Sequence, residues 1–259
     1  MIFHWMENRG PLSYTKIQEL TKSLDDAGFY SALFTFHSMS PDYIVTSAAA
    51  LNKNEKIKYM FAIRPFHMSY QYLSMVTESF NRICNNRIII NFVNGIDGRD
   101  DEKEHVDINN KLILNVEDRR KFVRNFVQEY KDYGLVKNIP RMVFSGDSSY
   151  VFETAHIYDS DIMIYLDSYL KSLHKYKNYS KKIIAVRVLA RDTDAEAEND
   201  IKKILAFKGI NCIYGSKETV AKKLLDLKEY NIPEIMIVTF VEDQRWENSI
   251  DAVKIALKN

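Results

Sequence analysis

The sequence predicts a (β/α)8 barrel, the α/β fold in which eight parallel strands alternate with helices around one core. The chain has 259 residues, which matches the length of roughly 250 residues typical of this fold. Hydrophobic residues make up 46% of the chain, enough for a large buried core. Short runs of β-branched and aromatic residues alternate with segments of helical periodicity throughout. We therefore expect residues 1–259 to form one barrel domain, with a doubly wound open sheet as the alternative.

The strands are predicted from eight apolar runs. Ile57–Ile63 and Arg87–Val93 enclose a helical pattern over Tyr70–Cys84, and a crossover of this length makes two strands parallel. This βαβ unit is the clearest in the chain. The eight predicted strands are Ile2–Met6, Ser31–Phe36, Ile57–Ile63, Arg87–Val93, Arg141–Phe144, Asp161–Leu166, Ile183–Ala190 and Glu234–Phe240.

The helices are predicted from periodicity and from residues that start or stop helices. Leu12–Ala27 follows the Gly10-Pro11 pair and ends before Gly28, and Ser40-Pro41-Asp42 is typical of an N-cap with proline in the first turn. Residues 95–115 are polar and predict a long loop or lid. The remaining helices are expected up to about Asn52, over Val116–Tyr133, Tyr150–Tyr158, Asp194–Phe207 and Lys217–Tyr230, and at the C-terminus, with Gly209–Tyr214 as a short connection.

Composition argues against several classes of function. The 36 basic and 35 acidic side chains form no long block of one sign, so we expect no nucleic acid and no membrane surface as partner. Cys84 and Cys212 have neither metal-ligand spacing nor a disulfide framework, which favours the cytoplasm. The first residues lack a basic region followed by an apolar core, and no stretch of about 18 apolar residues occurs, so we expect neither a secreted nor a membrane-spanning protein. Without a His-x-x-x-His pair or a clustered set of ligands, we expect no catalytic metal.

Residues that follow the predicted strands are the candidates for chemistry, because parallel barrels build their sites at the carboxyl ends of their strands. These candidates are His4, His37, Arg64, Asn91, Asn94, Ser148, Ser149, Asp167, Arg187, Arg191 and Thr239.

The run Ser145-Gly146-Asp147-Ser148-Ser149 joins a strand to a helix. Backbone N–H groups, two hydroxyls and a positive helix end suit a phosphate, although a serine N-cap explains the same residues equally well. The chain has no Walker-type lysine and no glycine-rich dinucleotide fingerprint.

Arg64, Arg187 and His37 are the candidate catalytic residues. Each arginine lies in or at the end of an apolar strand and needs either a carboxylate partner or a bound anion. His37 follows the second strand and is either a proton shuttle or a surface histidine.

Six segments, in order, resemble the bacterial luciferase-like flavin-dependent monooxygenase superfamily, and most closely its alkanesulfonate monooxygenase branch. They are AGFYSALF (Ala27–Phe34), Ser47–Pro65, LSMVTESFNRICNNRIIINFVNG (Leu73–Gly95), PRMVFSGDSS (Pro140–Ser149), Ile183–Ala197 and Gly215–Val238. Each segment alone is a weak signal, but their common order covers most of the chain.

The resemblance implies a luciferase-like TIM barrel that binds FMN and lets reduced flavin react with dioxygen at its open end. In relatives the loop after the fifth strand holds the phosphate, which corresponds here to Ser148 and Ser149. Asn91 and Asn94 match the family's asparagine-containing run at the flavin. His37 matches a histidine after strand two, and Arg64 and Arg187 match arginines of the alkanesulfonate branch.

Several departures from the family pattern bear on activity. Leu189 replaces a histidine, and Arg119-Arg120 stands where an Arg-Tyr pair is usual, so that Arg120 is a substitute contact for the phosphate. Asp147 brings a carboxylate beside the expected phosphate, which is unfavourable unless it points away or is paired. The insertions that cover the site in relatives are shortened, so we expect the 95–115 loop or a second subunit to keep water out.

The expected function is that of a two-component flavoprotein oxidoreductase. A separate reductase supplies FMNH2, and the monooxygenase acts on a small organic substrate. Arg64 and Arg187 would stabilise negative charge on the oxidant or substrate, and His37 would move a proton. The resemblance also implies that the protein forms a homodimer. The alternatives are a barrel that binds flavin or another phosphate ligand without turnover, and a flavin-free phosphate-binding lyase or isomerase.

Overall fold

The computed structural model describes residues 1–7, 12–35, 42–51, 56–93, 116–172, 179, 181–205, 211–241 and 243–259. The predictions made for His37, for Asn94 and for the 95–115 loop lie outside these residues.

Eight parallel strands close into a barrel, so the predicted fold class is confirmed. Neighbouring strands follow the order β6-β5-β4-β3-β2-β1-β9-β7, and pairing of β6 with β7 closes the ring. The barrel strands are β1 (Ile2–Glu7), β2 (Ser31–Phe34), β3 (Lys58–Ile63), β4 (Ile88–Phe92), β5 (Arg141–Ser145), β6 (Asp161–Tyr165), β7 (Lys182–Arg191) and β9 (Glu234–Val238).

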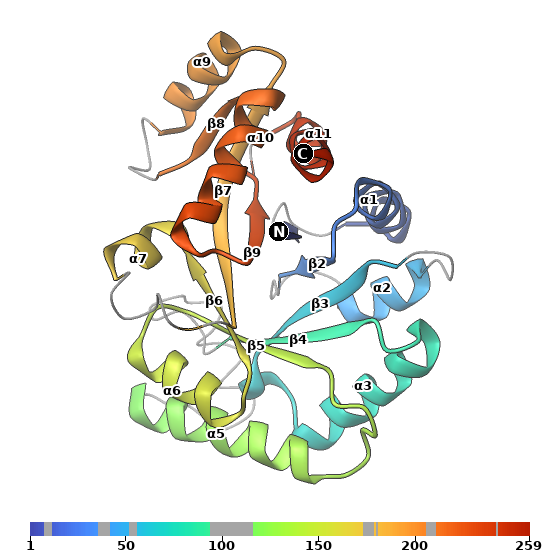
Figure 1. The fold of residues 1–259 in the computed structure, drawn as a ribbon. Coiled ribbons are helices and arrows are strands. Elements are labelled where there is room, and N and C mark those ends of the chain that lie inside the picture. Colours follow the sequence, from blue (N-terminus) through green and yellow to red (C-terminus); the bar gives the residue numbers. More distant parts are fainter. Residues whose placement is uncertain are drawn as a thin grey trace.

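Helices surround the strands, as Figure 1 shows. They are α1 (Tyr14–Ala27), α2 (Tyr43–Ala50), α3 (Tyr70–Cys84), α5 (Val116–Asp132), α6 (Ser149–Ile157), α7 (Leu166–Lys171), α9 (Asp194–Leu205), α10 (Lys217–Asp226) and α11 (Glu247–Lys258). Short 3-10 turns occupy Pro65–His67 and Leu227–Tyr230. Helix α11 packs beside both α1 and α10, which brings the last helix against the first.

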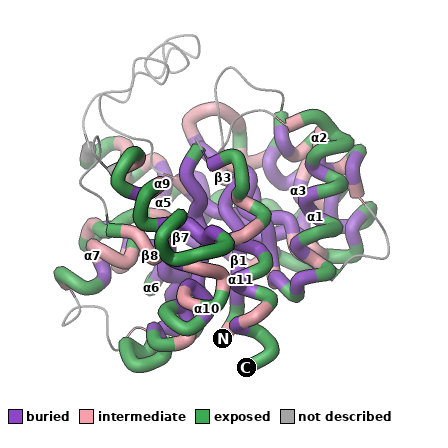
Figure 2. The backbone as a smooth tube through the Cα atoms, turned by 90° about the horizontal axis from the view of Figure 1, so that it is seen from above, coloured by how far each residue is buried: buried purple, intermediate pink, exposed green. Residues whose placement is uncertain are grey.

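Alternation along the strands separates two apolar layers. Met6, Leu33, Met60, Ile89 and Met236 belong to one buried cluster that fills the inside of the ring. Their strand neighbours, such as Trp5 and Phe61, face outward and join a second cluster under the helices. Figure 2 shows the strands buried at the centre and the outer helix faces exposed. The polar residues at either end of the inner layer are therefore the ones that can reach the openings of the barrel.

The structure adds two elements that the sequence did not predict. β8 (Ile213–Ser216) pairs with Val188–Arg191, the second half of β7, outside the barrel. Helix α7 begins directly at the end of β6. Both are too short to give a reliable periodic pattern, and β8 ends in Gly215-Ser216, which the sequence suggests as a helix start.

The start of α2 differs from the prediction. Asp42 is the N-cap, and its Oδ1 accepts hydrogen bonds from the backbone N–H groups of Ile44 and Val45. A carboxylate satisfies two helix-start donors at once, so it takes the cap position rather than Ser40 with proline in the first turn. Among the residues that the structure describes, no helix is both long and apolar enough to cross a bilayer.

Candidate active site at the carboxyl end of the barrel

The carboxyl end of the barrel gathers the last inward-facing side chains of its strands. Asn91 of β4, Ser145 of β5, Tyr165 of β6 and Arg187 of β7 each follow the inner apolar residues by two positions along the strand. The Ser145 hydroxyl donates a 2.7 Å hydrogen bond to Asn91 Oδ1. This bond fixes the side-chain amide of Asn91, which is only 1% exposed. The rim is thus built from polar groups held in place by rigid strands.

Arg187 lines a small cavity at this rim. The cavity has a volume of about 80 Å³ and also touches Tyr165, Asp167, Asn211 and Cys212. The Arg187 guanidinium lies 4.4 Å from the centre of the Tyr165 ring, a cation–π contact. No carboxylate among the described residues pairs with it. Its charge is therefore available to an anion.

Arg191, four residues further along the same strand, behaves differently. Its Nε donates to Asp200 Oδ2 at 2.7 Å, and its second guanidinium nitrogen lies 3.0 Å from Asp243 Oδ1. Arg191 is 4% exposed, so these two carboxylates compensate a buried charge. Arg191 is consequently structural, and β7 carries one paired and one unpaired arginine.

Arg64 follows β3 directly and is 7% exposed. In the closed ring β3 lies four strands from β7 in either direction. Arg64 and Arg187 therefore come from opposite sides of the barrel, and the fold does not bring them together as one clamp.

The loop after β5 forms the second part of the candidate site. Gly146 has φ +138°, and a Cβ there would come within 3.1 Å of Val151 Cγ2. Ser148 has the extended backbone of an N-cap, but its hydroxyl makes no capping hydrogen bond to α6. Ser148 is therefore the N-cap of α6 by position and backbone, as the capping explanation expects, but its hydroxyl does not cap the helix. Ser149 is the exposed first residue of the helix.

Arg120 lies beside the first turn of α6. Its guanidinium is 5.3 Å from the centre of the Tyr150 ring, and the Tyr150 hydroxyl donates a 2.6 Å hydrogen bond to the Arg120 carbonyl. Its ion pair with Glu117 is long, at 3.5 Å, and exposed. Arg120 of α5 thus contacts Tyr150, the residue after Ser149, although 30 residues separate the two in sequence.

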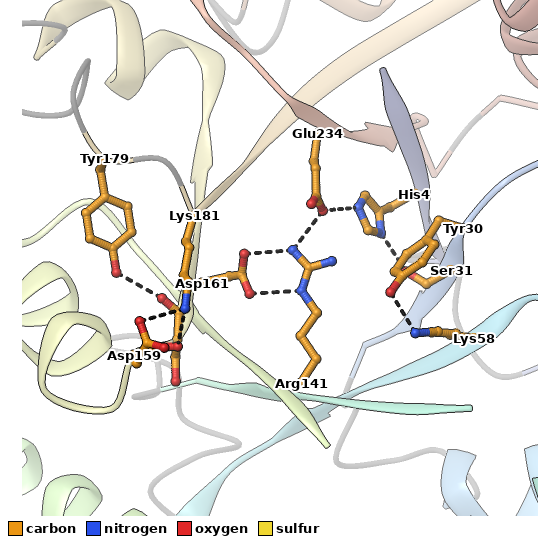
Figure 3. Close-up of polar contacts among 11 residues, drawn as sticks. His4, Tyr30, Ser31, Lys58, Arg141, Asp159, Asp161, Tyr179, Lys181 and Glu234 are labelled. Carbon is orange, nitrogen blue, oxygen red and sulfur yellow. Dashed lines mark hydrogen bonds and ion pairs between the residues drawn. The ribbon is translucent and has the colours of Figure 1, made fainter. Parts of the chain in front are cut away.

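A polar network occupies the opposite, amino end of the barrel (Figure 3). His4 Nδ1 lies 2.7 Å from Ser31 Oγ, and His4 Nε2 lies 2.8 Å from Glu234 Oε2. Arg141 forms two hydrogen bonds with Asp161 and a third, of 2.8 Å, with Glu234. The expectation that His4 follows a strand is therefore wrong: it lies within β1, far from the rim.

Burial controls the charges in this network. Burial lowers the pKa of His4 and outweighs its hydrogen bond to Glu234, which acts in the opposite direction. Burial by itself raises the pKa of Glu234, but the hydrogen bond from His4 and the charge of Arg141 prevail and hold this pKa below its usual value. A neutral His4 that donates to Glu234 and accepts from Ser31 satisfies every polar atom it has.

Sequence reasoning did not find this network, although a signal was present. Apart from His4, its members are polar residues at the start of otherwise apolar strands, namely Ser31, Arg141, Asp161 and Glu234. Tyr165, at the rim, was also missed because a tyrosine in an apolar run is expected in the core. Two other strand-end candidates are placed as follows. Asp167 accepts a 2.8 Å hydrogen bond from Asn211, and Thr239 is buried, with 2% of its surface exposed. Burial raises the pKa of Cys212 to about 12, so its thiol stays protonated.

No group of three or more potential metal ligands occurs within the described ranges.

No family model matches the chain. Solved structures of several enzymes share its fold, among them one in complex with FMN and one that depends on coenzyme F420. One is the oxygenating constituent of 3,6-diketocamphane monooxygenase of Pseudomonas putida in complex with FMN, with a TM-score of 0.73, 15% identity, and coverage of 98% of this chain and 97% of the other. An EDTA monooxygenase from a Chelativorans species has a TM-score of 0.74, 12% identity, and coverage of 100% and 93%.

A coenzyme F420-dependent tetrahydromethanopterin reductase from Methanopyrus kandleri is similar to the same extent. Its TM-score is 0.74 at 14% identity, and the match covers 98% of this chain and 97% of the other. At these identities the likeness establishes a shared fold over nearly the whole length of both chains.

Proposed function

We propose that the chain is an FMN-dependent monooxygenase of the luciferase-like superfamily, close to its alkanesulfonate branch, that oxidises a small anionic organic substrate. The observation that carries this proposal is Arg187, a guanidinium at the carboxyl rim without a carboxylate partner among the described residues. A half-buried charge in a small cavity is stabilised by a bound anion. The fold, shared with an FMN-bound monooxygenase, supports the choice of chemistry.

The loop between β5 and α6 fits the phosphate of FMN. Gly146 lets the backbone turn where a side chain would meet Val151, and the Ser148 hydroxyl is not used as a cap. Backbone N–H groups at the start of α6, two hydroxyls and the nearby Arg120 form a set of donors suited to a phosphate. Asn91, fixed by Ser145, is suited to hold a polar edge of the flavin ring, and Asn94 is proposed to do the same.

The residues divide the work as follows. When bound, reduced FMN supplies the electrons that activate dioxygen, and a separate reductase is proposed to provide it. Arg187 binds the anionic group of the substrate, with its plane set by the Tyr165 ring. Arg64 stabilises negative charge from the opposite side of the rim. His37 is proposed to move the proton, an assignment that rests on the sequence alone.

Water must be kept away from the reacting groups, and two features are suited to this. The segment entering β8 lies over the Arg187 cavity, where Asn211 is tied to Asp167 of α7 by the 2.8 Å hydrogen bond. A second copy of the chain is proposed as further cover, in a cytoplasmic homodimer.

One observation favours a second candidate function, a barrel that binds flavin without turnover. Leu189 stands where the alkanesulfonate branch has a histidine, and here it is fully buried against Ile201 and Phe240. No proton-transferring group can act from that position. If Leu189 is the decisive loss, binding persists but oxidation does not.

Reconstitution tests the proposal directly. The protein is combined with a flavin reductase, FMN and dioxygen, and matched pairs of anionic and neutral organic substrates are screened for oxygenated product. We expect oxygen-dependent product from anionic substrates only, with Arg187→Ala lowering it strongly. Tight flavin binding without product from any substrate would instead support the non-catalytic barrel.

A further inference from the structure

Asp147 places a negative charge in the loop proposed to bind phosphate. The loop joins β5 to α6, and a carboxylate directed toward the start of α6 would repel a phosphate there. In the structure this carboxylate contacts the start of α7. The Ser168 hydroxyl, in the first turn of α7, donates a 2.8 Å hydrogen bond to Asp147 Oδ2.

From this contact we infer that Ser168 is a positioning residue that turns the Asp147 carboxylate toward α7 and leaves the start of α6 free for the phosphate of the cofactor. The inference rests on the proposed function, because it concerns how that phosphate is accommodated. It assigns a role to a residue outside the loop itself and outside the strand ends.

The backbone around Asp147 supports this division. Gly146 is held by a hydrogen bond from its N–H to the Met163 carbonyl of β6, so the loop leans toward the β6–α7 side immediately before Asp147. Ser148 then takes extended dihedral angles, φ −79° and ψ 152°, and the chain enters α6. Asp147 therefore lies between two helix starts, and the Ser168 hydroxyl of α7 donates a hydrogen bond to its carboxylate.

Repulsion by the Asp147 carboxylate depends on the charge of the bound flavin. The phosphate of FMN carries close to two negative charges at neutral pH, whereas riboflavin carries none. If Ser168 keeps the carboxylate away, its loss should weaken FMN binding and leave riboflavin binding unchanged. A merely structural role for Ser168 would affect both flavins alike.

The test measures the affinities of FMN and riboflavin by flavin fluorescence for the wild type, Ser168→Ala, Asp147→Asn and the double variant. We expect Ser168→Ala to bind FMN on the order of fivefold more weakly, with riboflavin unaffected. Asp147→Asn in the Ser168→Ala background should restore FMN affinity to at least the wild-type level. Ser172→Ala is the matched control, since Ser172 ends the same helix and its hydroxyl forms no hydrogen bond within the described part of the chain.

The outcomes separate this inference from the proposed function. If Ser168→Ala binds FMN as tightly as the wild type does, or loses equal affinity for FMN and riboflavin, the inference about Ser168 is overturned while the proposed function stands. If the wild type binds neither flavin, inorganic phosphate is titrated with phosphorus NMR as the readout. Phosphate binding weakened by Ser168→Ala then supports the role of Ser168 although the flavin assignment fails, and absence of phosphate binding overturns both.

Discussion

The two arginines of β7 differ in what surrounds them, and this difference predicts opposite effects of the same substitution. Arg191→Ala should lower the free energy of unfolding by about 3 kcal/mol, because it leaves the fully buried Asp243 carboxylate without the guanidinium that compensates its charge. Arg187→Ala should change stability by about 1 kcal/mol or less, since it loses the cation–π contact with Tyr165 but no ion pair among the described residues.

Activity should show the reverse order. Loss of the Arg187 guanidinium removes the proposed anion contact and should lower kcat/KM for an anionic substrate by about 100-fold. Chemical denaturation and steady-state kinetics of the two variants provide both measurements. A large stability loss in Arg187→Ala would show that this arginine is structural and would remove the main support for an anion site.

His4 predicts how stability depends on pH. Burial holds the pKa of folded His4 below the ordinary value of 6.5. As pH falls through about 6.5, His4 becomes protonated in the unfolded chain but stays neutral in the folded chain. The folded state therefore loses stability relative to the unfolded state. Stability from this group is thus complete above that pH and decreases below it.

Urea unfolding at pH about 7.5 and about 5.5 measures this effect. The wild type should be less stable at the lower pH. His4→Gln should be less stable than the wild type at the higher pH by ~2 kcal/mol, because hydrogen bonds to Ser31 and Glu234 are altered, and its pH dependence should be flatter. An equally steep dependence in His4→Gln would assign the effect to another group.

At the scale of elements, the loop from β5 to α6 depends on Gly146. Gly146→Ala should cost about 1–3 kcal/mol of stability and weaken FMN binding, because the backbone is at φ +138° and the added methyl group meets Val151. Gly134→Ala is the control: Gly134 also has a positive φ, of +75°, but the nearest atom to an added Cβ is 3.9 Å away. Thermal unfolding and FMN titration of both variants test this. Equal FMN affinities of Gly146→Ala and Gly134→Ala would show that the loop does not take part in FMN binding.

Elements with strong local signals were predictable from the sequence. Helix α3 was predicted with its observed bounds because its apolar residues recur at helical spacing, and in the structure Ser69 caps it. β8 and α7 were not, since four and six residues carry too little periodicity, and each is stabilised by neighbours distant in sequence.

The candidate site was predictable only in part. The rule that strand ends carry chemistry leads to Arg187 and Asn91, but whether an arginine is paired depends on tertiary contacts. Arg191 gains Asp200 from α9 and Asp243 from the segment before α11, and neither is visible from the strand itself. His4 was misjudged for a related reason: the pattern of a strand shows which side a residue faces but not at which end of the barrel it lies.

At the scale of the whole molecule, an apolar face on α2 and α3 bears on the proposed homodimer. Val45 of α2 and Tyr72, Met75 and Ile83 of α3 are each more than half exposed. The three α3 residues share one side of the helix, so a second copy packing there would bury them. Met75→Asp should therefore yield monomers in light scattering, whereas Ile157→Asp, on the exposed side of α6, should not. A monomeric wild type at micromolar concentration would contradict the dimer.

The central claim is that this barrel uses reduced FMN, and an anaerobic titration tests it most directly. Wild-type protein and a Ser148→Ala/Ser149→Ala double variant are titrated with FMN, FMNH2 and coenzyme F420, with absorbance and fluorescence as readouts. We predict preferential binding of FMNH2 by the wild type and marked weakening in the double variant. Absence of binding to either form of FMN would contradict the account and leave a flavin-free barrel, and preferential binding of coenzyme F420 would contradict the choice of cofactor.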